Sequence, residues 1–222
     1  MKTPDREFIR SLAQAAIDRD EPTAWFDQLY QSAKREAGAI PWADLQPNPH
    51  LLEWLAGPDA SPSGSTALVV GCGLGDDAIA LAATGLQVTA FDVASTAIDW
   101  CLERFADAPV SFQVADLLDP PDAWQGAFDL VLESYTLQAL PPAPRAIATS
   151  QLARFVRPGG LLLVIARGRE PEDPPGTLPW PLTRNDLAPL LAGGLDLVRF
   201  EDFVEGTAPP IRRFRILYRR PA

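Results

Sequence analysis

The sequence predicts an α/β protein built on a doubly wound, mostly parallel sheet of seven strands with helices on both faces. Three observations lead to this prediction. From residue 66 onward, short apolar runs alternate with helical patterns, which is typical of parallel strands joined by crossover helices. Residues 161–166 (Leu-Leu-Leu-Val-Ile-Ala) are apolar on both faces, as expected of a strand covered on both sides. The last two strands have no helix between them, so we expect them to form an antiparallel hairpin.

The chain before residue 66 is expected to be helical. Apolar residues recur at helical spacing in its first two segments, and Asn48 and Pro49 suit the cap and first turn of a third helix. A stretch rich in Pro, Gly and Ser follows at residues 57–65. We therefore expect residues 1–57 to form a helical lid and residues 58–222 the main domain, within one structural unit. The predicted helices are residues 4–19, 23–34 and 50–56.

The elements after residue 66 follow from apolar runs bounded by Gly and Pro and from apolar spacing between them. The predicted strands are residues 66–70, 87–91, 110–114, 128–132, 161–166, 195–203 and 211–218. The predicted helices are residues 75–83, 94–105, 143–155 and 183–191. The motif Arg157-Pro-Gly-Gly160 is interpreted as the entry to the fifth strand.

Composition excludes several classes of function. The 222 residues carry 19 Lys and Arg against 29 Asp and Glu, a formal net charge of −10 that does not suit phosphate binding or an acidic membrane surface. Two cysteines and one histidine predict neither a disulfide framework nor a metal site. The N-terminus does not resemble a secretory signal. We expect a cytoplasmic protein, a monomer or homodimer, that acts on small molecules.

Three glycines at the end of the first strand predict a ligand-binding turn. Gly71, Gly73 and Gly75 lie between a strand and a helix, where a ligand can approach the backbone without obstruction by Cβ atoms. Asp76 and Asp77 follow at once and would repel a pyrophosphate at the helix N-terminus. The ligand is therefore expected to be uncharged or cationic at this point.

Two further acidic residues follow the next strands. Asp92 ends the second strand, where an acid accepts hydrogen bonds from a ribose diol. Asp116 follows the third strand and is placed to meet an adenine amino group. Ligands of open α/β sheets bind beyond the carboxyl ends of the strands, so the two acids and the glycine turn together predict an adenosine-containing ligand.

These motifs resemble those of class I S-adenosylmethionine-dependent methyltransferases over residues 66–166. The resemblance rests on the glycine turn, Asp92, Ala115-Asp116-Leu117, Phe128-Asp-Leu-Val131 and Arg157-Pro-Gly-Gly-Leu161. It implies a Rossmann-like sheet, S-adenosylmethionine as cofactor and S-adenosylhomocysteine as product. The cofactor-binding residues it implies are Gly71, Gly73, Gly75, Asp92, Val93, Asp116, Leu117, Glu133 and Trp42.

A narrower resemblance is to the thiopurine, thiol and halide methyltransferase branch. Its motifs are Ala39-Ile-Pro-Trp42, Pro47-Asn-Pro-His-Leu51, residues 133–140 (Glu-Ser-Tyr-Thr-Leu-Gln-Ala-Leu) and Pro179-Trp-Pro-Leu-Thr183. By this resemblance Trp42 lies against the cofactor and Tyr135 faces the transferable methyl group. Leu137 and Gln138 replace the Phe-Phe-Cys usual in that branch, and Glu133 stands where Asp is frequent. The resemblance also implies acceptor contacts from Phe26, Tyr30 and Trp180.

The sequence allows more than one kind of methyl acceptor and more than one way of activating it. A thiolate or halide needs no strong base, whereas a hydroxyl or amine would need Tyr135 or Glu133 to take or orient its proton. Arg167 is a candidate contact for an anionic substrate, and residues 170–181 form either a lid or a surface loop. We interpret His50 as a residue that starts a helix. The terminal arginines are interpreted as an exposed edge of the sheet: Arg212, Arg213, Arg215, Arg219 and Arg220.

The sequence thus predicts a small-molecule methyltransferase, with a thiol, another soft sulfur nucleophile or a halide as the acceptor. The alternatives are an oxygen, nitrogen or carboxylate acceptor, or a cofactor-binding subunit without catalysis. Redox chemistry with NAD is a more distant possibility, because it would share the glycine turn and Asp92 with this chain but not the terminal hairpin.

Overall fold

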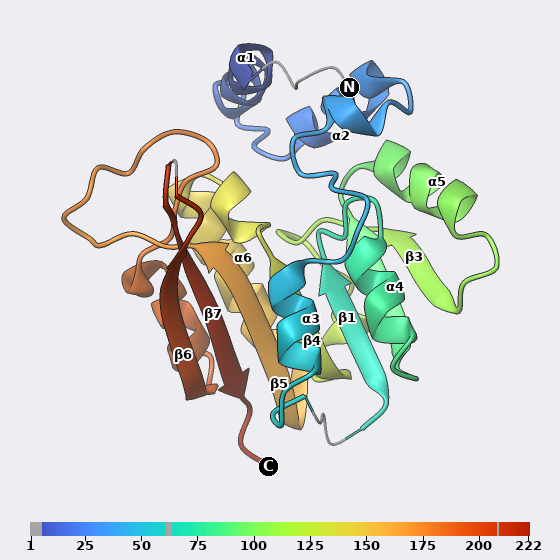
Figure 1. Cartoon of the computed structure of the whole chain (residues 1–222), viewed down its shortest axis with the longest axis vertical. Helices are drawn as coiled ribbons and strands as arrows, with labels where there is room; N and C mark the ends of the chain where they lie inside the picture. The colour runs from blue at the N-terminus through green and yellow to red at the C-terminus, as the bar shows by residue number, and fades with distance from the viewer. Residues whose placement is uncertain (1–5, 61–63, 208) are drawn as a thin grey trace.

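A computed structural model describes residues 6–60, 64–207 and 209–222 of the chain. Seven strands form a sheet in the order β3-β2-β1-β4-β5-β7-β6 (Figure 1). Strands β1 to β5 pair in parallel, and β7 pairs antiparallel with both β5 and β6, which confirms the predicted fold. The strands are β1 (Thr66–Val70), β2 (Gln87–Asp92), β3 (Val110–Val114), β4 (Phe128–Ser134), β5 (Val156–Arg167), β6 (Asp196–Glu205) and β7 (Ile211–Arg219).

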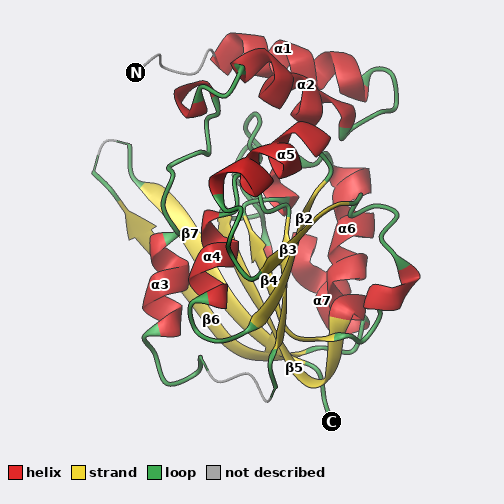
Figure 2. Cartoon of the chain, turned by 90° about the vertical axis from the view of Figure 1, so that its right-hand side faces the viewer, coloured by secondary structure: helices red, strands yellow, loops and turns green. Residues whose placement is uncertain are grey.

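Helices cover both faces of the sheet. Figure 2 shows α3 and α4 on one face and α6 and α7 on the other. The α-helices are α1 (Arg6–Ile17), α2 (Ala24–Ala33), α3 (Pro49–Leu55), α4 (Asp76–Ala82), α5 (Ser95–Arg104), α6 (Pro142–Phe155) and α7 (Ala188–Ala192). Short 3-10 helices are η1 (Ala37–Ala39), η2 (Asp122–Trp124), η3 (Leu137–Ala139) and η4 (Arg184–Leu187).

The apolar run in β5 explains how the two faces are held. Leu162, Val164 and Ala166 pack in the cluster that contains α6, whereas Leu163 and Ile165 pack in the cluster that contains α3 and α4. Each buried Leu, Val or Ile contributes about 1.5–3 kcal/mol relative to an exposed one. Side chains alternate along the strand, so Arg167 projects to the same face as Ile165.

The N-terminal helices form a third apolar cluster with α5. Trp25 and Tyr30 of α2 are buried together with Ile9 of α1 and with Trp100 of α5. In Figure 1, α1 and α2 lie beyond the carboxyl ends of β1 and β5. Residues 4 and 5 of the first predicted helix lie outside the described residues.

The two largest differences from the sequence prediction concern the start of β5 and the helix predicted over residues 183–191. Strand β5 begins at Val156, which pairs with Phe128, and the register then shifts before Leu161 pairs with Leu130. The motif at residues 157–160 is therefore part of an irregular strand. The predicted helix over residues 183–191 is divided into η4 and α7, with Pro189 in the first turn of α7. Proline lacks the N–H that would continue the preceding turn.

The interpretation of the terminal arginines as an exposed edge is wrong. Strand β6 is the edge, and β7 lies between β5 and β6. The side chains of Arg213 and Arg215 are only 12% and 15% exposed and pair with Glu205 and Glu201. The order of strands in the sheet, which the sequence alone did not reveal, decides their environment.

Candidate active site

One cavity of about 780 Å³ lies at the carboxyl ends of the parallel strands. It is lined by Gly71 after β1 and by Tyr135 and Thr136 after β4. Strands β1 and β4 are neighbours at the point where the order of the strands reverses, the usual binding site of doubly wound sheets. The Thr136 hydroxyl donates to the Val70 carbonyl at 3.1 Å, which joins the two strand ends.

The glycine turn is adapted to close approach. Gly71, Gly73 and Gly75 have φ angles of +58°, +55° and +88°, which glycine adopts readily. A Cβ atom at Gly71 would collide with the Thr136 side chain, and one at Gly73 would lie 3.4 Å from the Tyr30 hydroxyl oxygen. Gly71 and Gly73 line the cavity, whereas a Cβ at Gly75 would meet Phe112 at 3.0 Å behind the turn.

Asp92 and Asp116, the two residues predicted to contact the nucleoside, line the cavity together with Val93 and Leu117. The Asp92 carboxylate is 8% exposed and accepts hydrogen bonds from the N–H groups of Gly73 (3.0 Å) and Ala94 (2.9 Å). Burial raises the pKa of Asp92 to about 6, so the carboxyl is mainly ionised above neutral pH. Asp116 accepts from the Leu118 N–H at 2.8 Å. Each carboxylate retains lone pairs for further hydrogen bonds.

The acidic rim predicted from the sequence is partly neutralised. Asp76 pairs with Arg104 at 2.8 Å. Asp77 accepts from the Asn48 N–H at 2.6 Å, and burial raises its pKa. Both residues line the cavity, but Asp76 is neutralised by a guanidinium group, whereas Asp92 and Asp116 accept only from backbone N–H groups.

Aromatic side chains from the N-terminal region face the glycine turn. The Trp42 indole N–H donates to the Tyr30 hydroxyl oxygen at 2.7 Å. The ring centroid of Trp42 lies 6.1 Å from that of Phe26 and 6.0 Å from that of Tyr30, and all three residues line the cavity. An aromatic face attracts a cation within about 6 Å, so this group suits a positively charged ligand.

Tyr135 lines the cavity in an unusual backbone conformation. Its φ of +63° is in the left-handed region, which is strained for a non-glycine residue and often found at functional sites. Its N–H donates to the Ile165 carbonyl at 2.9 Å, and the Arg213 guanidinium lies 5.1 Å from its ring centroid. Burial raises the pKa of the Tyr135 hydroxyl, so the group is neutral and can donate a hydrogen bond.

Glu133 lies beneath the cavity and does not line it. The side chain is fully buried, and Oε1 accepts from the N–H groups of Thr136 (2.8 Å) and Leu137 (2.9 Å). Burial raises the pKa of Glu133 to about 7. By this geometry Glu133 holds the loop that carries Tyr135 and does not contact a ligand in the cavity.

The segment at residues 170–181 reaches the cavity through Thr177, Leu178 and Pro179, but not through Trp180. The backbone N–H of Trp180 donates to the backbone carbonyl of Gln138 at 2.7 Å. Arg169 fastens the base of the segment, donating to the carbonyls of Pro181 and Asp173 at 3.2 and 3.0 Å.

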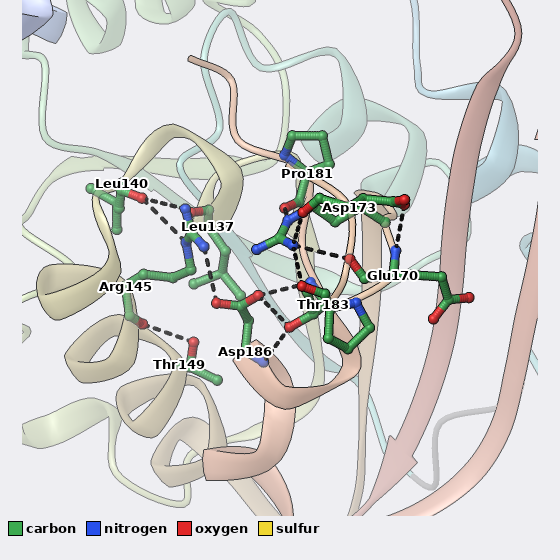
Figure 3. Close-up of polar contacts among 11 residues, drawn as sticks. Leu137, Leu140, Arg145, Thr149, Glu170, Asp173, Pro181, Thr183 and Asp186 are labelled. Carbon is green, nitrogen blue, oxygen red and sulfur yellow. Dashed lines mark hydrogen bonds and ion pairs between the residues drawn. The ribbon is translucent and has the colours of Figure 1, made fainter. Parts of the chain in front are cut away.

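A buried network supports the loop that follows Tyr135 (Figure 3). Arg145 is 4% exposed and donates to the carbonyls of Leu137 (3.1 Å) and Leu140 (2.8 Å). It also pairs at 3.0 Å with Asp186, which forms a capping box with Thr183. The loop and the helix that follows residues 170–181 are therefore fixed to one another.

Several lining residues were not predicted as site residues. Asn48 donates from Nδ2 to Ser134 Oγ at 2.9 Å, and Nε2 of His50 lies 3.0 Å from Glu205 Oε2. The predicted candidate Arg167 lines the same end, together with Arg213. Arg213 could have been predicted as a site residue only from the pairing of β7 with β5, which places it beside Arg167. Over the described ranges, no cluster of three or more His, Cys, Asp and Glu is arranged to hold a metal ion. None of the helices in those ranges has the length and apolarity to cross a membrane.

Comparison with known proteins agrees with this geometry. Residues 67–160 match the family model described as a methyltransferase domain. A probable thiol methyltransferase 2 of Arabidopsis thaliana is 31% identical over 59% of this chain, and a thiocyanate methyltransferase 1 of Brassica oleracea is 26% identical over 69%. The matches cover 58% and 62% of those two relatives. A 2-methyl-6-phytyl-1,4-hydroquinone methyltransferase of Synechocystis sp. is 34% identical over 52% of this chain and 36% of its own length.

Solved structures share the fold. The N-methyltransferase NodS of Bradyrhizobium japonicum WM9, in complex with S-adenosylhomocysteine, superposes with a TM-score of 0.68 at 22% identity, covering 88% of this chain and all of that one (100%). A structure described by the conversion of a disulfide bond into a thioacetal group during echinomycin biosynthesis gives a TM-score of 0.71 at 22% identity, covering 90% and 91%.

Proposed function

We propose that the chain is a class I S-adenosylmethionine-dependent methyltransferase that methylates a small thiol or another soft nucleophile, a halide included. The observation that carries the proposal is the continuity of the cavity from the glycine turn and Asp92 to Tyr135. A cofactor and an acceptor bound at its two ends would meet within one cavity. Methyl transfer depends on such alignment, because nucleophile, methyl carbon and leaving sulfur must lie in line.

The residues of the glycine-turn end fit S-adenosylmethionine. Asp92 would accept from the ribose hydroxyls and Asp116 from the adenine amino group, while the backbone at Gly71 and Gly73 leaves room for close approach. Trp42 would face the cationic sulfonium. When bound, the cofactor supplies a methyl group on positively charged sulfur, a good leaving group.

The acceptor end favours a nucleophile that ionises by itself. Tyr135 is neutral and suited to orient the nucleophile by a hydrogen bond rather than to take its proton. Glu205 is engaged by Arg213 and His50. A thiol has a pKa of about 8.5, and neighbouring cations lower it further, so a thiolate forms without a strong base.

The names of the relatives support a sulfur acceptor. Two of them are thiol and thiocyanate methyltransferases, and both match this chain over more than half of its length. The second candidate is an enzyme that methylates a hydroxyl, with His50 as the proton acceptor held by Glu205 at 3.0 Å. The hydroquinone methyltransferase among the relatives keeps this candidate open.

The N-terminal region completes the proposed site. We assign residues 1–57 as a lid, helical in its described part from Arg6 onward, and residues 58–222 as the catalytic domain, since Phe26, Tyr30 and Trp42 close the cavity over the glycine turn. Exclusion of water strengthens electrostatic interactions inside such a site. The net charge of −10 argues against binding to nucleic acid or to an acidic membrane surface. We further propose a cytoplasmic monomer or homodimer.

The proposal is tested in two steps. Thermal unfolding is first measured with S-adenosylhomocysteine and, separately, with NAD. A ligand that binds the native state at a hundredfold excess over Kd stabilises it by about 2.7 kcal/mol. Thiols, halides, phenols, amines and carboxylates are then screened with S-adenosylmethionine for methylated products.

We expect stabilisation by S-adenosylhomocysteine and S-methyl products from thiols. Stabilisation by NAD alone would contradict the methyltransferase proposal. Tight binding of the cofactor product with no methylation of any acceptor would instead indicate a cofactor-binding subunit.

A further inference from the structure

The acceptor end of the cavity is rich in arginine. Arg167 of β5 and Arg213 of β7 are direct partners in the antiparallel register, and both line the cavity. Side chains directly opposite each other lie on the same face of a sheet, and like charges in that position are destabilising. Arg6 and Arg10 of α1 line the cavity as well. The fold therefore keeps Arg167 and Arg213 side by side, despite their repulsion, in the wall of the cavity where their positive charge can serve binding.

The carboxylates near this end do not balance the arginines. Glu205 pairs with Arg213 and also lies 3.0 Å from His50 Nε2. The remaining lining carboxylates lie on other elements, in the loop before α3, at the start of α4 and at the ends of β2 and β3: Asp44, Asp76, Asp77, Asp92 and Asp116.

Arg167 is the uncompensated member of the pair. Within the described ranges its guanidinium forms no ion pair, and its Nε is buried without a hydrogen-bond partner. Burial lowers the pKa of Arg167, and repulsion from Arg213 and Arg6 lowers it further. Arginine stays charged in proteins, so this cost is borne as a positive charge that an anion would relieve.

The position of Arg167 is fixed relative to the reaction centre. Its backbone N–H donates to the side-chain oxygen of Gln138 at 2.8 Å, and Gln138 is only 5% exposed. Its cross-strand partner Arg213 lies 5.1 Å from the ring of Tyr135. An anion held by the two arginines would thus lie beside the residue proposed to face the transferable methyl group.

We propose that the methyl acceptor is a mercapto acid whose carboxylate is bound by Arg167, with Arg213 beside it. This inference rests on the proposed function and names its substrate class. Planar guanidinium groups match carboxylates through paired hydrogen bonds. The thiol proton is released to solvent, the thiolate sulfur forms a bond to the methyl carbon, and the bond from that carbon to the sulfonium sulfur breaks with its electron pair left on the sulfonium sulfur. The carboxylate keeps its charge throughout.

The test compares binding of 3-mercaptobenzoate with that of 3-mercaptobenzamide, which has the same thiol and no charge. Calorimetric titrations are run on the full chain with and without S-adenosylhomocysteine, so no turnover is required. We expect the acid to bind about tenfold or more tightly than the amide, as a charge-assisted hydrogen bond would give. Arg167→Gln should abolish this preference and leave the affinity for S-adenosylhomocysteine unchanged.

Two further variants sharpen the result. Arg167→Lys keeps the charge without the planar fork and should retain part of the preference. Arg154→Gln removes an exposed arginine at the end of α6 and should change nothing. Equal binding of acid and amide to the wild type, a preference that survives in Arg167→Gln, or methyl ester formation from 3-mercaptobenzoate would overturn the inference. A failure of S-adenosylhomocysteine to bind would overturn the proposed function instead.

Discussion

The two ends of the cavity are built in different ways and carry opposite charge. The end proposed to bind the cofactor comes from the loops after β1, β2 and β3 and presents glycine backbone and the carboxylates Asp92 and Asp116. The end proposed to bind the acceptor comes from β5, β7 and α1 and presents arginines. The first end is assembled from short local motifs, and the second from residues that meet only through the register of distant strands. Local motifs thus provide the proposed site for a cofactor that many enzymes share. The register of distant strands provides the proposed site for the one acceptor of this protein.

The largest effect is expected from Asp92→Ala at the cofactor end. The buried carboxylate is proposed to bind ribose and also accepts from the Gly73 N–H. Loss of charge-assisted hydrogen bonds of about 1.5–3 kcal/mol each should weaken binding of S-adenosylhomocysteine by about thirtyfold or more. Titration calorimetry measures it, and the acid–amide preference at the acceptor end should persist. Wild-type affinity in Asp92→Ala would remove the residue from the site.

The next effect isolates close approach at the glycine turn. Gly71→Ala and Gly85→Ala both place alanine at positive φ, at a cost of about 1–2 kcal/mol in stability. A Cβ at Gly85 has no neighbour within 4 Å, whereas at Gly71 it would displace Thr136. We expect both variants to melt earlier but only Gly71→Ala to lose affinity for S-adenosylhomocysteine. Equal losses of affinity would mean that the turn does not contact the ligand.

A third prediction concerns Glu133, between the two ends. Burial raises its pKa from 4.5 to about 7, so the folded state holds the proton more tightly than the unfolded state. The resulting stability is present below pH 4.5 and is lost as the pH rises towards 7. Glu133→Gln stays neutral and keeps an oxygen for the N–H groups of Thr136 and Leu137. It should gain up to about 3 kcal/mol relative to wild type above pH 7 and nothing below pH 4.5.

Denaturant unfolding at pH 4.5, 6 and 8 checks this prediction. Asp92, whose pKa of about 6 is also raised by burial, contributes in the same direction in both proteins and cancels in the comparison. Methyl transfer should be retained in Glu133→Gln because the residue positions a loop. Loss of transfer with normal affinity for S-adenosylhomocysteine would show that Glu133 takes part in the chemistry.

The smallest effect is expected from Trp180→Ala. The side chain does not line the cavity, and its link to Gln138 is made by the backbone, which the substitution preserves. The Michaelis constant for a thiol acceptor should change by about twofold or less, as for a surface substitution. A tenfold increase would show that residues 170–181 close over the acceptor.

The same division explains what the sequence could predict. The glycine turn, Asp92 and Asp116 lie at or within two residues of the end of a strand, so the strand pattern places them at one end of the sheet. Arg213 requires knowledge that β7 lies between β5 and β6, and the chain itself allows the hairpin to be arranged in either order. Burial of Glu133 also escaped prediction, because the fold of the loop after β4 turns its carboxylate towards backbone N–H groups.

The central claim is that the end of the cavity lined by Gly71, Gly73, Asp92 and Asp116 binds S-adenosylhomocysteine. Titration of the full chain with S-adenosylhomocysteine, with NAD as a parallel ligand, tests it most directly. The proposed site predicts saturable binding of S-adenosylhomocysteine with one site per chain, weakened in Asp92→Ala, and no binding of NAD. Binding of NAD without binding of S-adenosylhomocysteine would contradict the account.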